Sequence, residues 1–165
     1  MTIVRSESPS DIAPIRAVHV ACFPTDAEAL LVDRLRDAGR LTVSMVAEID
    51  EQVVGHVALS PVSATAASPG VGLAPLAVLP GYRGRGTAAE LVRQSLARGA
   101  ALGLGWAVVL GDPAYYARFG FGPAAESGLT DEYGGGPAFQ VVELVEGRLP
   151  AGAGLVRYAP EFASL

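Results

Sequence analysis

The hydrophobic residues of the chain follow two kinds of spacing, a period of two and a helical period. Apolar and polar side chains alternate over residues 42–49, and this period of two predicts a β-strand. A short turn at 50–52 separates it from a largely apolar run at 53–59, which predicts a second, central strand. Two strands joined by so short a turn are expected to pair antiparallel.

A helical period, with apolar residues three and four positions apart, predicts three longer helices, at residues 10–23, 25–38 and 87–102. Ser10 is a candidate N-cap of the first helix. Thr25 and Glu28 have the form of a capping box for the second, in which the Thr oxygen accepts from a helical amide and the Glu reaches back to the cap.

Shorter patterns complete the chain, with strands predicted at residues 2–5, 73–78, 106–110 and 138–145 and a short helix at 113–118. The small, polar segment 61–72 is expected to form an exposed loop. The predicted order is β-α-α-β-β-β-α-β-α-β, which indicates an α/β or α+β fold with a mixed sheet. A length of 165 residues fits one domain that spans 1–165.

Composition then excludes several classes of protein. The 12 basic residues, all arginine, face 17 acidic ones, so the net charge of −5 argues against nucleic-acid binding and against docking on anionic membranes. The one cysteine, Cys22, permits no intramolecular disulfide and no zinc cluster, and no bound metal is expected. No apolar stretch approaches about 18 residues, and the start of the chain is unlike a secretory signal. We therefore expect a cytoplasmic globular protein.

The turn within residues 78–88 carries the strongest chemical signal. A strand leads into a turn with three glycines, and the turn opens directly onto a helix. The first amides of a helix lack internal partners and its dipole is positive there, so this arrangement suits a pyrophosphate. Arg83 and Arg85 add two cations. An ordinary tight turn with two solvated arginines is the alternative.

Two other phosphate motifs do not fit this turn. A P-loop requires a lysine, which the chain lacks. The residues from Gly84 to Ala89 nearly match a dinucleotide fingerprint, but antiparallel strands before them are wrong for a doubly wound sheet.

The same segment closely resembles the acetyl-CoA motif of the GNAT superfamily of N-acetyltransferases, V-x-P-x-x-[QR]-x-x-G-x-[GA]. Its fixed positions are held by Val78, Pro80, Arg83, Gly86 and Ala88. A second segment resembles the family's Y-x-x-x-G-F pattern, with Tyr116, Gly120 and Phe121 on the fixed positions. Residues 110–121 are similar to a branch of bacterial predicted acetyltransferases, the YhbS-like branch, and the whole resemblance covers roughly residues 2 to 145.

This resemblance implies the GNAT fold and the transfer of an acetyl group from acetyl-CoA to a primary amine by direct attack. It implies that strand residues Leu76, Ala77 and Val78 offer backbone groups to the pantetheine arm. It assigns the pyrophosphate to the turn and the start of the helix, that is, to Arg83, Gly84, Arg85, Gly86, Thr87 and Ala88. It makes Tyr116 a general acid toward the CoA thiolate, whereas a packed aromatic ring with one hydrogen bond is the alternative.

The group that takes the proton from the amine is not identified by the sequence. Glu28 is one candidate, because the resemblance places the first two helices beside the acceptor, and its capping box is the alternative. His19 and His56 are more typical of buried, hydrogen-bonded imidazoles than of bases. Asp112 is more typical of the N-cap of the helix at 113–118. Glu48 faces either the acceptor or solvent.

Two other functions stay open at this point. One is a non-catalytic acyl-CoA-binding sensor module, and the other is a nucleotide-binding regulatory domain, against which the missing P-loop lysine counts. The acceptor amine is open between a polyamine, an amino acid, an aminoglycoside-like drug and a protein N-terminus. A homodimer is compatible with the apolar composition.

Overall fold

A computed structural model describes all residues, 1–165, and the chain divides into two compact units. Unit 1 comprises Met1–Leu59, Ala74–Ser95 and Pro160–Leu165. Unit 2 comprises Ser60–Leu73 and Leu96–Ala159. The single domain expected from the sequence stays a prediction.

Unit 1 is built on strands that follow the predicted alternation. Strand β1 (Thr2–Ser6) pairs antiparallel with β2 (Val43–Ile49), and β2 pairs antiparallel with β3 (Gln52–Val62). The β2–β3 turn is made by Asp50 and Glu51, both with positive φ, so the predicted hairpin is confirmed. Strand β4 (Gly70–Val78) is the next neighbour of β3.

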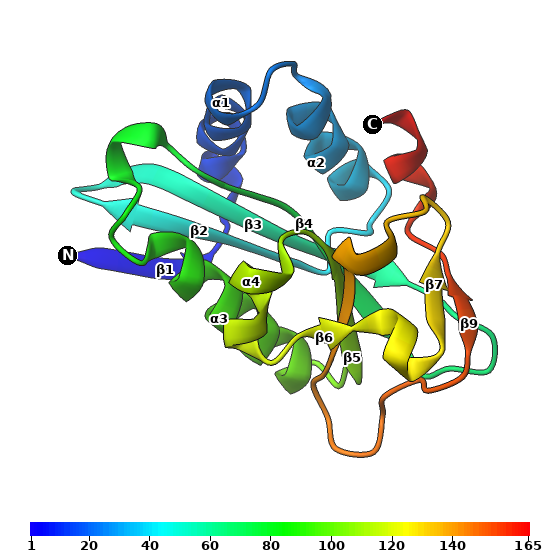
Figure 1. Cartoon of the computed structure of the whole chain (residues 1–165). Helices are drawn as coiled ribbons and strands as arrows, with labels where there is room; N and C mark the ends of the chain where they lie inside the picture. Colours follow the sequence, from blue (N-terminus) through cyan, green and yellow to red (C-terminus); the bar gives the residue numbers. More distant parts are fainter. The chain divides into compact units, whose positions relative to one another are not determined.

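The helices of unit 1 cover both faces of these strands. Helices α1 (Ile12–Cys22) and α2 (Ala27–Asp37) lie on one face, and α3 (Thr87–Ala101) begins on the other (Figure 1). A cluster of buried apolar side chains joins α1 and α2 to β2, and its members are Ile15, Val32 and Val46. The buried positions recur at helical spacing, as the sequence predicts.

The start of α1 differs from the prediction. Ser10 is not its N-cap, because a 3-10 turn at Pro9–Asp11 precedes the helix and the cap interaction joins Ser8 to Asp11. The amide of Ser8 donates to Asp11 Oδ2 at 2.7 Å. The proline at the first position of the turn favours this earlier start, since its missing N–H is not needed there.

The capping box expected at the start of α2 is wrong. Thr25 Oγ1 accepts from the amide of Ala27 at 3.2 Å, which moves the helix start to Ala27 with Asp26 as N-cap. Glu28 is then the second helical residue, too early to reach back to the cap. Its Oε1 is buried and has no hydrogen-bond partner.

Unit 2 holds the parallel pairing that makes the sheet mixed. Strand β5 (Trp106–Leu110) pairs parallel with the first residues of β4 and antiparallel with β8 (Phe139–Glu143). Strand β6 (Gly122–Pro123) pairs with β8, whereas β7 (Leu129–Asp131) and β9 (Gly154–Val156) form a separate parallel pair. The short helices of the whole chain are α4 (Pro113–Tyr116) and 3-10 helices at Pro9–Asp11, Pro80–Tyr82, Ala117–Phe119, Ala124–Ser127, Gly136–Ala138 and Pro160–Ser164. The predicted mixed α/β fold is confirmed.

The loop expected at residues 61–72 is confirmed only for residues 63–69, because β3 continues to Val62 and β4 already begins at Gly70. A Cβ at Gly70 would lie 2.4 Å from the Trp106 ring, and one at Gly72 would lie 2.6 Å from the Tyr158 ring. Glycine is therefore required here by close packing of aromatic rings on a strand, not by a loop.

We expect Gly70→Ala to lower the free energy of unfolding by about 1–3 kcal/mol, the usual cost of overpacking. Urea denaturation followed by circular dichroism measures the difference. Gly122→Ala is the matched control, since a Cβ there meets nothing within 4 Å. A Gly70→Ala protein as stable as the wild type would contradict the packing of Trp106 on this glycine.

Candidate active site

The turn between β4 and α3 has its backbone turned toward open space. Gly84 and Gly86 have φ of +77° and +79°, a conformation that only glycine adopts freely. A Cβ added at Gly81, Gly84 or Gly86 would meet nothing within 4 Å. A ligand can therefore approach the main chain of this turn closely.

The beginning of α3 supplies donors for an anion. The amide of Glu90 makes the first bond of the helix, to Gly86 O at 3.0 Å, so the amides of the three residues before it have no carbonyl within the helix. Thr87 is only 4% exposed, and its Oγ1 is buried without a hydrogen-bond partner. An unpaired buried hydroxyl costs stability, so this position is better explained by a ligand than by packing. The residues present fit a pyrophosphate.

The two arginines of the turn differ in their surroundings. Arg83 Nε donates to the carbonyl of Val78 at 2.8 Å, which ties the turn to the end of β4. Cys22 Sγ on α1 donates to the same oxygen at 3.4 Å. Arg85 is exposed, with its guanidinium carbon 5.3 Å from the centre of the Tyr82 ring. Arg83, also exposed, is thus tied to the strand end, whereas Arg85 makes only a long bond of 3.4 Å to Gly81 O within the turn.

The last part of β4 offers main-chain rather than side-chain groups. Its parallel ladder with β5 contains three pairs and ends at Gly72 and Val108. Of the three residues predicted to meet the pantetheine arm, Ala77 and Val78 are 5% and 6% exposed, and Leu76 is half-buried. What they can present to a ligand is therefore mainly backbone.

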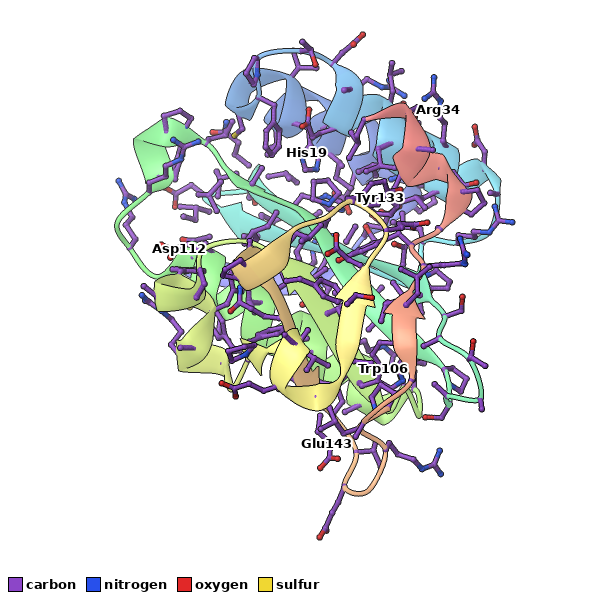
Figure 2. The ribbon with its side chains drawn as sticks, turned by 45° about the vertical axis from the view of Figure 1, so that its right-hand side comes forward. His19, Arg34, Trp106, Asp112, Tyr133 and Glu143 are labelled. Atoms are coloured by element: carbon purple, nitrogen blue, oxygen red, sulfur yellow. The ribbon has the colours of Figure 1, made fainter.

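Tyr116 lies in unit 2 at the end of α4. Asp112 caps this helix by accepting from the amide of Ala114 at 3.0 Å, so the predicted N-cap is confirmed, and Figure 2 shows Asp112 at its start. The Tyr116 ring packs edge-on against Phe121 and leaves no room for a Cβ at Gly111. Burial raises the pKa of Tyr116 to about 12, so its hydroxyl stays protonated at neutral pH and can donate a hydrogen bond.

The two histidines form a pair that the sequence did not indicate. Both are buried, as expected, but His19 Nε2 lies 2.7 Å from His56 Nδ1, and His56 Nε2 lies 2.8 Å from Ser44 Oγ. Burial lowers the pKa of His19 to about 4 and holds the pKa of His56 well below its usual value. The pair is separated by 37 positions, and only the burial of each imidazole could be inferred from the sequence.

The remaining candidates do not gather into a second site. Glu48 pairs with Arg5 at 3.0 Å, which occupies its carboxylate. No three histidine, cysteine or acidic side chains lie close enough together to hold a metal ion. None of the helices has both the length and the apolar character needed to cross a membrane.

The buried histidines predict a loss of stability in weak acid. The unfolded chain takes up protons near pH 6.5, whereas folded His19, with its pKa of about 4, stays neutral until lower pH. The folded state is therefore disfavoured as the pH falls between these values, and we expect His19 alone to cost about 2 kcal/mol between pH 7.5 and pH 5. Urea denaturation at both pH values measures this. His19→Gln should flatten the dependence, and a wild type of equal stability at both pH values would contradict the burial of a neutral imidazole.

Comparisons with known proteins agree with this geometry. Residues 12–121 match the sequence model of the family described as Acetyltransferase (GNAT) family. The N-acetyltransferase YhbS of Escherichia coli K12 is 44% identical over 163 residues, which cover 97% of this chain and 98% of YhbS. The crystal structure of E. coli YhbS in complex with CoA matches with a TM-score of 0.93, covering 98% of this chain and 92% of that one. A GNAT family acetyltransferase from Brucella melitensis, in complex with acetyl-CoA, matches with a TM-score of 0.81 at 37% identity, covering 98% of both chains.

The family model covers more than half of the chain, and the relatives align with nearly all of it. The chain belongs to the acetyltransferase (GNAT) family.

Proposed function

We propose that this protein binds acetyl-CoA and transfers its acetyl group to a primary amine by direct attack of the amine on the thioester carbon. The observation that carries the proposal is the turn before α3, with two left-handed glycines, free first-turn amides and the unpartnered Thr87 hydroxyl. CoA in the E. coli YhbS structure and acetyl-CoA in the Brucella structure support the same ligand.

In this proposal the diphosphate binds the backbone from Arg83 to Ala88. Several amides in one turn spread the charge of the anion over fixed donors, and the dipole of α3 adds to their effect. The exposed Arg85 supplies a cation, whereas Arg83 holds the turn against Val78. The backbone of Leu76, Ala77 and Val78 binds the pantetheine arm.

The reaction itself needs a positioned amine and a stabilised oxyanion. The nitrogen of the neutral amine forms a bond to the acetyl carbon, the C–S bond breaks, CoA leaves as a thiolate, and the nitrogen loses one proton to solvent. A backbone amide at the end of β4, at Val78 or its neighbour, donates to the carbonyl oxygen as it becomes negative. No step requires a covalent intermediate on the protein.

Tyr116 is assigned to the CoA sulfur because of its position in the family's Y-x-x-x-G-F pattern. With a pKa of about 12, its hydroxyl is a much weaker acid than a thiol of ordinary pKa, roughly 8.5. Complete proton transfer to the thiolate is therefore uphill. Tyr116 acts chiefly as a hydrogen-bond donor that stabilises the leaving thiolate.

The acceptor is proposed as a primary amine on a small molecule or a peptide. A net charge of −5 favours the approach of cationic amines. A cytoplasmic location and a homodimer stay predictions. The alternative, a sensor module that binds acyl-CoA without turnover, is separated from an enzyme by the release of free CoA thiol with a panel of amines: spermidine, lysine, kanamycin and a short peptide with a free N-terminus.

We expect Gly86→Glu to weaken acetyl-CoA binding by roughly 100-fold or more, about 3 kcal/mol, since its carboxylate repels the diphosphate. Isothermal titration calorimetry measures the affinity. Gly103→Glu is the matched control, because Gly103 has a φ of +85° and equally open surroundings at the other end of α3. Both variants carry the same backbone strain, and equal affinities for acetyl-CoA would contradict the proposed diphosphate site.

We expect Tyr116→Phe to lower kcat by roughly tenfold to 100-fold, as for the loss of one hydrogen bond to a developing charge. The affinity for acetyl-CoA should change less than twofold, because the ring and its packing remain. CoA thiol release and calorimetry measure the two quantities. Tyr115→Phe, one position earlier on the same helix, serves as control, and an unchanged kcat in Tyr116→Phe would remove the role of its hydroxyl.

A further inference from the structure

Four side chains of unit 1 form one continuous hydrogen-bond chain. His19 on α1 bonds to His56 on β3, with 2.7 Å between Nε2 and Nδ1. His56 Nε2 lies 2.8 Å from Ser44 Oγ on β2. The Ser44 hydroxyl in turn donates to Glu7 Oε1, just after β1. The chain thus leads from the end of α1 to a carboxylate.

The Glu7 carboxylate determines which atom carries the hydrogen in each of the other three side chains. An ionised carboxylate only accepts, so the Ser44 hydroxyl points its hydrogen at Glu7. Ser44 Oγ then accepts from His56 Nε2–H, which leaves Nδ1 of the neutral His56 ring as an acceptor. His19 must donate to it through Nε2–H. The network therefore assigns a bare lone pair to His19 Nδ1.

This lone pair has no partner in the protein. His19 is fully buried, and its Nδ1 makes no hydrogen bond. Figure 2 shows His19 on the inner side of α1, toward the strands of unit 1. A buried acceptor without a partner costs stability, and the buried polar groups of native proteins are nearly always paired. The ring stacks on Phe23, with 5.9 Å between the ring centres, but this packing gives Nδ1 no hydrogen-bond partner.

The histidine pair lies beside the end of β4. Cys22, one helical turn after His19, donates to the carbonyl of Val78 at 3.4 Å. The strand that carries His56 runs beside the end of β4, because Val54 O accepts from the amide of Leu79 at 2.8 Å. The proposed function places the acetyl carbonyl at this end of the strand.

Resting on the proposed function, we propose that His19 and His56 form a proton relay that deprotonates the acceptor ammonium. The proton binds Nδ1 of His19, directly or through one water. The Nε2 proton of His19 moves to Nδ1 of His56, the Nε2 proton of His56 moves to Ser44 Oγ, and the Ser44 hydroxyl proton moves to Glu7. The amine loses one proton, the carboxylate gains one, and both rings stay neutral in the opposite tautomer.

The charged and titratable neighbours of the relay determine where along it the proton can be held. The charged and titratable groups near it are Cys22 on α1, Glu7, and Arg36 of α2, which pairs with Glu7 at 3.0 Å and with Asp33. Burial of both rings disfavours imidazolium, so neither ring can hold a second proton and each has to pass it on toward Glu7. The Glu7 side chain is 17% exposed, which gives the proton an exit to solvent.

His19→Gln tests the relay. The glutamine Nε2 can still donate to His56, but an amide does not accept a proton at neutral pH. With the panel amine that the wild type turns over fastest, we expect kcat at pH 7 to fall by about 100-fold, within the range for general bases. The affinity for acetyl-CoA should change less than twofold. Val20→Gln, the same substitution at a 53% exposed position of α1, should leave both unchanged.

The pH profile separates a relay from a structural role. Without a base only the free amine reacts, so kcat of His19→Gln should rise about tenfold per pH unit toward the pKa of the amine, while the wild-type value stays level. A loss that is equal at every pH, or no loss, would overturn the relay. If the wild type releases no CoA with any amine, the proposed function fails and the relay with it, and the wild type alone reveals this.

Ser44→Ala provides a second variant should His19→Gln not fold. It interrupts the path to Glu7 but keeps both rings, so we expect a smaller loss of kcat, about tenfold, with the same recovery at high pH. Nitrogen-15 NMR of the wild-type protein tests the starting state without any acceptor. It should show His19 protonated at Nε2 and bare at Nδ1, and a proton on Nδ1 would overturn the assignment.

Discussion

The carbonyl of Val78 is the point on which the arrangement of the site depends. It closes β4 and accepts both from Arg83, in the turn that follows, and from Cys22 on α1. One oxygen therefore fixes the strand end, the anion-binding turn and the first helix against one another. The hydrogen bond from Arg83 that holds this junction is part-buried, although Arg83 as a whole is exposed. Its bond to Val78 preorganises the turn before any ligand binds, and preorganised donors lose little energy in reorganising.

Unit 1 leaves four buried side-chain atoms without partners, and two of them belong to the proposed chemistry. Thr87 Oγ1 lies at the start of α3, and His19 Nδ1 lies at the end of α1. Each costs stability in the free protein, since a desolvated polar atom without a hydrogen bond is unfavourable. Such costs are typical of sites where a ligand or a proton supplies the missing partner. The first suits an anion, and the second suits a proton.

Burial also sets the protonation state of the chemical groups. It raises the pKa of Tyr116 to about 12 and lowers the pKa of His19 to about 4, so both are neutral at physiological pH. The same physical cause thus yields a hydrogen-bond donor in one case and, in the other, a neutral ring that can pass a proton on but does not hold it. In each, the charged form is disfavoured because the low-polarity surroundings solvate it poorly.

Local patterns of residues were enough to predict most of the elements and the family resemblance. Period-two and helical patterns located β2, β5 and α3 almost to the residue, and the glycine turn and Tyr116 pattern identified the GNAT resemblance. These features are local, so the chemistry of neighbouring residues suffices to encode them. The loop predicted at 61–72 extends too far at its end because Gly70 and Gly72 pack on Trp106 and Tyr158, which are distant in the chain. The bond between His19 and His56, and the tautomers that follow from it, could not be predicted from local patterns, because they depend on side chains of α1, β3 and β2 and on Glu7 meeting in the folded chain.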